Sequence, residues 1–255
     1  MVSTVQGGAR DLSACALFLD FDGTLVEIAP TPDAVVVDPG LPALLAALRT
    51  RLGGALAIVT GRALGDVDAF LPGLDLDACG MHGLERRLGG MTSLPDDLAD
   101  LTPEIALLRE RLAFHPGLIV EDKRIGVAVH WRTAPEAEGA ARAAIDDLAG
   151  RLGPEYRIQD GKAVREIVPA RAGKGEGIGA MMRTAPYAGR FPIFVGDDRT
   201  DEHGFVTVNR LGGLGVKIGA GDTSASRRVA SVPSFRTVLQ GWLDEGVDPL
   251  RLPPA

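Results

Sequence analysis

Short apolar runs alternate with helical patterns along the first ninety residues of the chain. Apolar runs at residues 16–19 and 55–59 each end in a polar turn, as is typical of buried strands in a parallel sheet. Residues 41–52, rich in leucine and alanine, and residues 63–71, which end before a proline, predict helices. Strands and helices in alternation predict a doubly wound α/β core.

The pattern changes after about residue 90, where polar and apolar positions alternate over short stretches. A helical stripe of apolar residues covers residues 135–152. Strand candidates surround it at residues 117–121, 125–132 and 155–168, with turn signals suited to hairpins. This part of the chain predicts a small, mainly antiparallel α/β module.

The parallel pattern returns from about residue 170. A helix is predicted from about residue 173 to 184, and the apolar run 192–195 ends in Gly196-Asp197-Asp198. Thr200 is predicted to cap the helix that follows. The second half of the parallel core therefore ends a strand in two carboxylates, as the first half does.

At 255 residues the chain suits one large domain or two modest ones, and its two patterns predict a division into two. We predict a Rossmann-like, doubly wound parallel-sheet core formed by residues 1–92 and 169–255. Residues 93–168 are predicted to be an inserted, smaller α/β domain with a mainly antiparallel sheet.

Composition and charge narrow the class of protein. The net charge of −7 argues against binding to nucleic acid or to anionic membranes. No apolar run approaches the roughly 18 residues of a membrane span, and the first sixteen residues lack the features of a signal peptide. The cysteines Cys15 and Cys79 lie beside apolar segments and are predicted to be buried thiols. We expect a cytoplasmic monomer that binds neither nucleic acid nor membranes.

Polar signals end three of the predicted parallel strands. They are Asp20-x-Asp22, Thr60-Gly61-Arg62 and Asp197-Asp198. The carboxyl ends of parallel strands meet at one edge of the sheet, where ligands bind, and carboxylates gathered there repel one another unless a cation lies between them. Because the set contains neither histidine nor cysteine, it favours Mg²⁺ over zinc. Mg²⁺ is commonly completed by a substrate phosphate, which suggests phosphoryl transfer.

Lys174 is predicted to lie at the start of a helix, between Gly173 and Gly175. A cation at that position meets the positive end of the helix dipole, which costs about 0.3 kcal/mol or more. Its position is easier to explain if an anion binds nearby. We therefore interpret Lys174 as part of the same site as the acidic strand ends.

Taken together, the motifs resemble those of a known superfamily. The chain resembles the haloacid dehalogenase superfamily in the order and spacing of four motifs, which are here Asp20–Leu25, Thr60, Lys174 and Gly196–Asp198. Within that superfamily it resembles the bacterial trehalose-6-phosphate phosphatases. This closer resemblance rests on residues 20–32, 80–85, 196–202, 208–213 and 216–219, which the general chemistry does not require.

The resemblance implies a phosphatase that works through an aspartyl-phosphate intermediate. Asp20 would be the nucleophile, and Asp22 would protonate the leaving sugar oxygen and then activate water. Thr60 would donate a hydrogen bond to the phosphoryl group, and Lys174 would balance its charge. The implied reaction is the hydrolysis of trehalose 6-phosphate to trehalose and phosphate.

The resemblance also implies a Mg²⁺ ion held by Asp20, the main-chain carbonyl of Asp22, and Asp197. Asp198 would support the waters of the metal or orient the lysine. For Asp201, helix capping is the simpler interpretation.

The inserted domain would be a cap that closes over the site and selects the sugar. Its selecting residues would be Glu121, Lys123 and Glu166, because carboxylates bonded to vicinal hydroxyls are left unpaired by a wrong sugar. The full set of candidate substrate-binding residues is Gly23, Gly61, Arg62, His82, Glu121, Lys123, His130, Arg132 and Glu166.

Two alternatives stay open at this point. The same chemistry could act on another sugar phosphate, of the sucrose-phosphate or mannosylglycerate-phosphate type. The chain could also be a non-catalytic sugar-phosphate sensor or a partner subunit of a synthase, although none of the core motif residues is missing.

Overall fold

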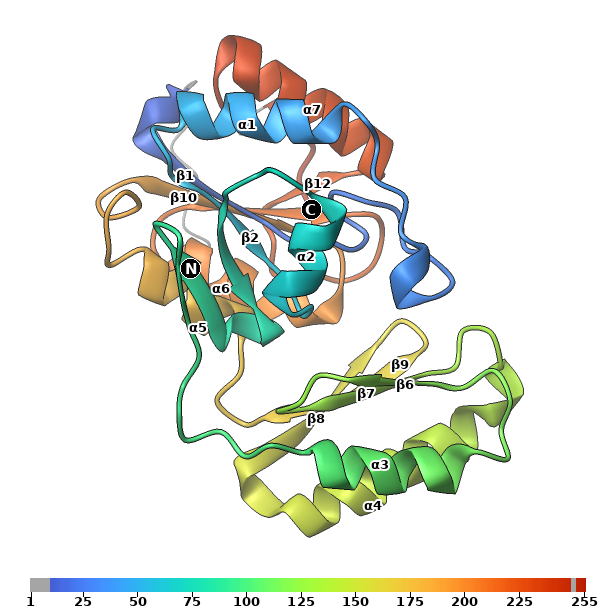
Figure 1. Ribbon diagram of the computed structural model, residues 1–255. Coiled ribbons are helices and arrows are strands. Elements are labelled where there is room, and N and C mark those ends of the chain that lie inside the picture. Colours follow the sequence, from blue (N-terminus) through green and yellow to red (C-terminus); the bar gives the residue numbers. More distant parts are fainter. Residues whose placement is uncertain (1–9, 249–250) are drawn as a thin grey trace. The chain divides into compact units, whose positions relative to one another are not determined.

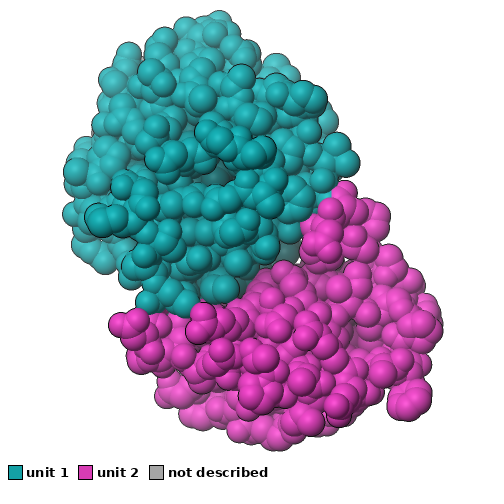
Figure 2. Space-filling model, viewed as in Figure 1, with its two compact units in different colours: residues 1–28, 35–94, 173–255 teal, residues 29–34, 95–172 magenta. Residues whose placement is uncertain are grey.

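A computed structural model of the chain describes residues 10–248 and 251–255. The chain forms two compact units, coloured separately in Figure 2. Unit 1 is made of Met1–Ile28, Val35–Leu94 and Gly173–Ala255, and unit 2 of Ala29–Ala34 and Pro95–Ala172. Among the described residues, no helix is both long and apolar enough to cross a membrane.

Unit 1 contains an eight-stranded sheet, which confirms the predicted parallel core. The strands lie in the order β12-β11-β10-β1-β2-β3-β4-β5. The first six in this order are parallel to their neighbours, whereas β4 and β5 pair antiparallel at one edge. Their bounds are β1 Cys15–Leu19, β2 Leu56–Val59, β3 Asp77–Gly80, β4 Glu85–Leu88, β5 Met91–Ser93, β10 Phe191–Gly196, β11 Leu214–Ile218 and β12 Arg227–Val229.

Helices cover both faces of this sheet (Figure 1). The buried side chains of α1, α2 and α7 pack with Leu17 and Leu19 of β1, whereas those of α5 and α6 pack with Phe18. Side chains of successive strand residues point to opposite faces, so a strand buried on both faces must be apolar throughout. The helices are α1 Leu41–Arg51, α2 Leu64–Phe70, α5 Lys174–Met181, α6 Glu202–Arg210 and α7 Val232–Glu245.

The register of the central strands aligns their carboxyl ends. Leu19, the last residue of β1, lies opposite Val195 of β10 on one side and Ile58 of β2 on the other. The residues that follow these three strands therefore reach the same edge of the sheet, as the sequence predicted.

Unit 2 contains a four-stranded antiparallel sheet in the order β6-β7-β9-β8, packed on two helices. Val127, Val129 and Ile167 lie on the sheet face that packs against Ile105 and Ile145 of the helices. The elements are α3 Thr102–Leu112, β6 Ile119–Asp122, β7 Val127–His130, α4 Glu138–Leu152, β8 Tyr156–Gly161 and β9 Val164–Pro169. The strand candidate at 155–168 is thus a hairpin of two strands.

Short 3-10 turns connect several of these elements. They are Leu12–Ala14, Pro32–Ala34, Met81–Gly83, Pro135–Ala137, Gly153–Glu155 and Arg199–Asp201. The last of them corrects one prediction, because Thr200 lies inside this turn and does not cap the helix. Asp198, whose backbone is extended, caps the turn and accepts a hydrogen bond from the backbone N–H of Asp201.

Candidate active site

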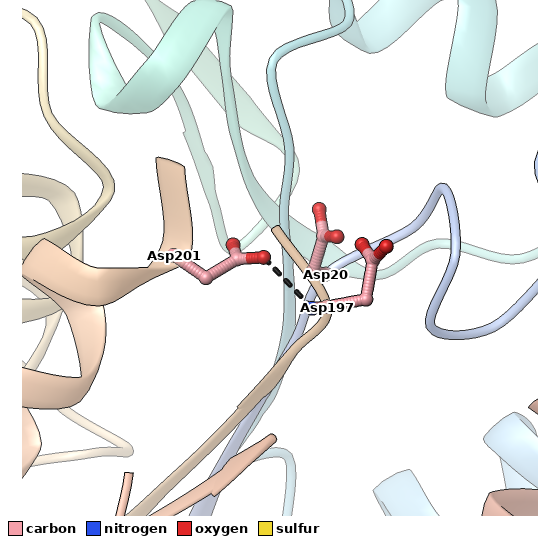
Figure 3. A group of neighbouring side chains, drawn as sticks. All are labelled: Asp20, Asp197 and Asp201. Atoms are coloured by element: carbon pink, nitrogen blue, oxygen red, sulfur yellow. Dashed lines mark hydrogen bonds between the residues drawn. The ribbon is translucent and has the colours of Figure 1, made fainter. Parts of the chain in front are cut away.

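Three buried aspartates meet at the carboxyl edge of the sheet in unit 1 (Figure 3). Asp20 follows β1, Asp197 follows β10, and Asp201 ends the 3-10 turn that precedes α6. One carboxylate oxygen of each residue lies within 4.8 Å of the other two. Buried carboxylates at this spacing repel one another unless cations or protons offset their charge.

Lys174 supplies one cation to this group. It is the first residue of α5, its side chain is 4% exposed, and its Nζ donates to Oδ1 of Asp20 and to Oδ1 of Asp201, both at 2.7 Å. Burial by itself would lower the pKa of Lys174, but the two carboxylates raise it above its ordinary value. Lys174 is therefore a permanently charged bridge between the two aspartates.

For Asp20, the effect of burial on the pKa outweighs that of the neighbouring cation. Burial raises the pKa of Asp20 well above its ordinary value, and the charge of Asp201 adds to this rise, while Lys174 opposes it. The hydroxyl of Thr24 also donates to Oδ2 of Asp20, at 3.4 Å. A further cation beside Asp20 would stabilise its ionised form.

Asp201 is more than a helix-capping residue. Its side chain is fully buried, and its Oδ2 accepts hydrogen bonds from the backbone N–H groups of Asp197 and Asp198, both at 2.9 Å. In this structure Asp201, and not Asp198, bonds Lys174. The signal available in the sequence was an acidic residue four positions after Asp197, in the first turn after a strand end.

Gly23 allows Asp197 to approach the Asp20-x-Asp22 motif. Its φ of +79° lies in the region that favours glycine. A Cβ atom at this position would lie 2.3 Å from Cγ of Asp197. The glycine of the Asp-x-Asp-Gly sequence is therefore required by the close packing of two strand ends.

Asp22 lies outside the buried group of three. Both of its carboxylate oxygens accept from Arg62, with Nε–Oδ2 at 2.6 Å and Nη2–Oδ1 at 2.8 Å. The guanidinium also lies 5.1 Å from the centre of the Phe70 ring. Thr60, directly after β2, accepts from the backbone N–H of Arg62 at 3.1 Å. The loop after β2 thus holds the carboxylate that the resemblance assigns as acid and base.

His82 lies beside the same loop. It is buried, has a φ of 55°, and donates its backbone N–H to the carbonyl of Thr60 at 3.0 Å. A Cβ atom on Gly61 would come within 2.5 Å of Cε1 of His82. Gly61, Arg62 and His82 therefore form one packed group next to the acidic edge.

The buried carboxylates fit a divalent cation of the Mg²⁺ class. Oxygen donors without histidine or cysteine are the ligands that Mg²⁺ prefers. Three carboxylates outnumber the Lys174 ammonium that bonds two of them. Asp201 already accepts three hydrogen bonds, so Asp20 and Asp197 are the better candidates for direct ligands.

A second polar cluster lies on the face of the unit 2 sheet that is opposite the helices. Glu121 and Glu166 flank Ala128 across neighbouring strands. Lys123 bonds Oε1 of Glu166 at 2.8 Å and lies 4.0 Å from Oε1 of Glu121. Nε2 of His130 lies 2.7 Å from Oε2 of Glu121. The structure therefore brings together four of the candidate sugar-binding residues.

Neighbouring side chains in this cluster stabilise the negative charge of Glu121. Burial would raise the pKa of Glu121, but Lys123 and His130 outweigh it and hold that pKa below its ordinary value. Arg132 is not part of the cluster, because its exposed guanidinium donates to the carbonyl of Lys162, at 2.6 Å.

The fold and the acidic edge define a class of enzyme, and comparison with known proteins defines the family. The fold is that of the haloacid dehalogenase-like phosphatases. The sequence model of the trehalose-phosphatase family matches residues 18–234. The chain belongs to this family and is a phosphoric monoester hydrolase. The resemblance inferred from the motifs is confirmed.

Individual relatives agree with this assignment. The chain is 45% identical to a probable trehalose-phosphate phosphatase of Sinorhizobium fredii, over 89% of this chain and 85% of the relative. It is 42% identical to the trehalose-6-phosphate phosphatase of Escherichia coli, over 90% and 85% of the two chains. A solved structure of a trehalose-6-phosphate phosphatase related protein matches with a TM-score of 0.77 and 28% identity, and covers 91% of this chain and 98% of its own.

Replacement of Asp201 by asparagine tests its place in the site. The amide cannot offer three acceptor positions to Lys174 and two backbone N–H groups, so a buried charge pair is broken. We expect Asp201→Asn to lower the free energy of unfolding by about 3–5 kcal/mol and kcat with p-nitrophenyl phosphate by about 10-fold or more. Urea denaturation and initial rates measure the two effects.

Asp11→Asn is the matched comparison for this variant. Asp11 caps the 3-10 turn Leu12–Ala14, away from the acidic edge, and its side chain accepts from the backbone N–H of Ser13. Because aspartate and asparagine are nearly equivalent caps, the stability and kcat of this variant should stay near those of the wild type. Equal losses of stability and of kcat in the two variants would show that Asp201 has no special role.

Proposed function

We propose that the protein hydrolyses trehalose 6-phosphate to trehalose and inorganic phosphate. The observation that carries the chemistry is the buried Asp20 carboxylate, bonded to Lys174 at the carboxyl edge of the parallel sheet. The choice of substrate is supported by relatives of 42–45% identity that are named for this phosphate ester and align with both units.

In the first step Asp20 attacks phosphorus. A carboxylate oxygen of Asp20 forms the new bond to phosphorus, and the bond from phosphorus to the sugar oxygen breaks on the opposite side. Asp22, protonated and released from Arg62, gives its proton to the departing sugar oxygen, so that trehalose leaves as a neutral alcohol. Lys174 offsets negative charge on the reacting groups.

In the second step water hydrolyses the aspartyl-phosphate. Asp22, now a carboxylate, takes a proton from the attacking water, and the bond from phosphorus to Asp20 breaks to release phosphate. The pairing with Arg62 defines the starting position of Asp22. Thr60, directly after β2 at the same edge of the sheet, would donate a hydrogen bond to the phosphoryl group.

A Mg²⁺ ion would be held by Asp20, Asp197 and the main-chain carbonyl of Asp22, with Asp198 in support. When bound, the ion supplies positive charge that offsets the charge of the nucleophile and of the phosphoryl oxygens. Asp201 bonds the backbone of Asp197, so the side chain of Asp197 starts from a fixed position.

Unit 2 would bind the sugar through its polar cluster. Glu121 and Glu166 can accept from sugar hydroxyls, while Lys123, which bonds Glu166 and lies 4.0 Å from Glu121, holds the two carboxylates in place. His130 orients Glu121 through its hydrogen bond. A substrate that lacks the matching hydroxyls cannot form these hydrogen bonds, which lowers its rate.

A panel of sugar phosphates tests the assignment of the substrate. We expect phosphate release from trehalose 6-phosphate to exceed that from glucose 6-phosphate and sucrose 6-phosphate by about 100-fold or more in kcat/KM. Addition of EDTA should abolish the release, and excess Mg²⁺ should restore it. Comparable rates with glucose 6-phosphate would refute the trehalose assignment, and activity in EDTA would refute the metal.

Asp20→Asn tests the nucleophile. The change is nearly isosteric, but an amide is a poor nucleophile, so we expect kcat to fall by at least about 10³-fold. Circular dichroism should show an intact fold. Substantial residual turnover, or an acyl-phosphate trapped by acid quenching in the variant, would contradict the assignment.

Glu166→Gln tests sugar selection. Loss of a hydrogen bond between charged groups costs about 1.5–3 kcal/mol, or roughly 10- to 100-fold in kcat/KM for trehalose 6-phosphate. The rate with p-nitrophenyl phosphate should stay near that of the wild type, because this ester has no sugar. Glu136→Gln, at an exposed position of unit 2, is the control. Equal losses with both substrates would mean that Glu166 does not select the sugar.

A further inference from the structure

Lys217 is a buried lysine that the proposed mechanism does not use. It belongs to β11, lies opposite Gly196 of β10, and is 5% exposed. Its Nζ donates to the main-chain carbonyl of Asp197 at 2.6 Å. A buried ammonium is costly unless its interactions compensate for lost hydration. Here the compensation comes from a carbonyl directly beside the acidic edge.

The peptide group that links Asp197 to Asp198 is bonded at both ends by charged side chains. Its carbonyl accepts from the ammonium of Lys217, and its N–H donates to Oδ2 of Asp201 at 2.9 Å. The carbonyl oxygen is the negative end of a peptide dipole, and the N–H is the positive end. Each end therefore faces a charge of the opposite sign, and rotation of this peptide would break both bonds.

This peptide is part of the backbone from which the side chain of Asp197 extends. Lys174 bonds the side chains of Asp20 and Asp201, whereas Lys217 bonds the backbone of Asp197. The two buried lysines thus have different tasks at one site. Lys174 bridges carboxylates, and Lys217 together with Asp201 fixes the backbone from which the third carboxylate extends.

We propose that Lys217 is a positioning residue for Asp197 and thereby increases the affinity of the acidic group for a divalent cation. The inference rests on the proposed function, because it takes Asp197 as a metal ligand. Groups that orient the ligands of a metal, without contacting it, commonly change its affinity by about 10- to 100-fold.

Mn²⁺ binding to the purified full chain tests this inference, because Mn²⁺ accepts the same oxygen donors as Mg²⁺ and can be titrated by electron paramagnetic resonance without turnover. We expect Lys217→Met, which keeps the length of the side chain but removes its charge and donors, to weaken Mn²⁺ binding by about 10- to 100-fold. The KM for trehalose 6-phosphate at saturating metal should change far less.

Lys162→Met is the matched control, since Lys162 is exposed in unit 2; its Mn²⁺ affinity should equal that of the wild type. Circular dichroism and Tm establish that the variants are folded. If Lys217→Met cannot be purified, Lys217→Gln replaces it, and the same loss of affinity is expected.

The outcomes separate the inference from the proposed function. If the wild type binds Mn²⁺ and a folded Lys217 variant binds it equally well, the positioning role is overturned and the proposed function stands. If the wild type itself binds no Mn²⁺ and hydrolyses its substrate in EDTA, the metal is overturned and the inference falls with it. If the KM rises by the same factor by which the metal affinity falls, the site is damaged in general and the inference is also overturned.

Discussion

The ammonium of Lys174, held between Asp20 and Asp201, is the interaction on which the rest of the active site depends. Ionised carboxylates can be buried together at the edge of a parallel sheet only if nearby cations offset their charge. Placing the cation requires α5 to begin at this edge, at the unfavourable positive end of its dipole. The two ion pairs, each at 2.7 Å, compensate for that position.

This constraint explains why two aspartates separated by one residue have different environments. Asp20 continues the line of β1 into the buried group, and its side chain is 5% exposed. Asp22 lies in the turn that follows, is 34% exposed, and pairs with Arg62. These environments suit the proposed roles, because a nucleophile must be held rigidly, whereas an acid and base must exchange protons with water and with the leaving group. The end of one strand provides both positions.

The sheet of unit 2 has two chemically different faces, because successive side chains of a strand point to opposite faces. One face packs apolar side chains on α3 and α4, and the other carries Glu121, Lys123, His130 and Glu166. Ala128 lies between the two glutamates in the register of the strands. Its small side chain lets longer polar side chains meet above it. This face can therefore carry a polar cluster while the other face belongs to the apolar core.

The sequence by itself determined the parallel core and the strand ends and predicted the residues that are proposed to react, because apolar periodicity and short motifs are local properties. It left Asp201 as a helix cap, assigned the orientation of Lys174 to Asp198 as one option, and gave no role to Lys217. Those assignments depend on which side chains meet across segments 20 or more residues apart. Only the packing of β10, β11 and α5 decides them, because side-chain directions at a sheet edge follow from register and helix placement.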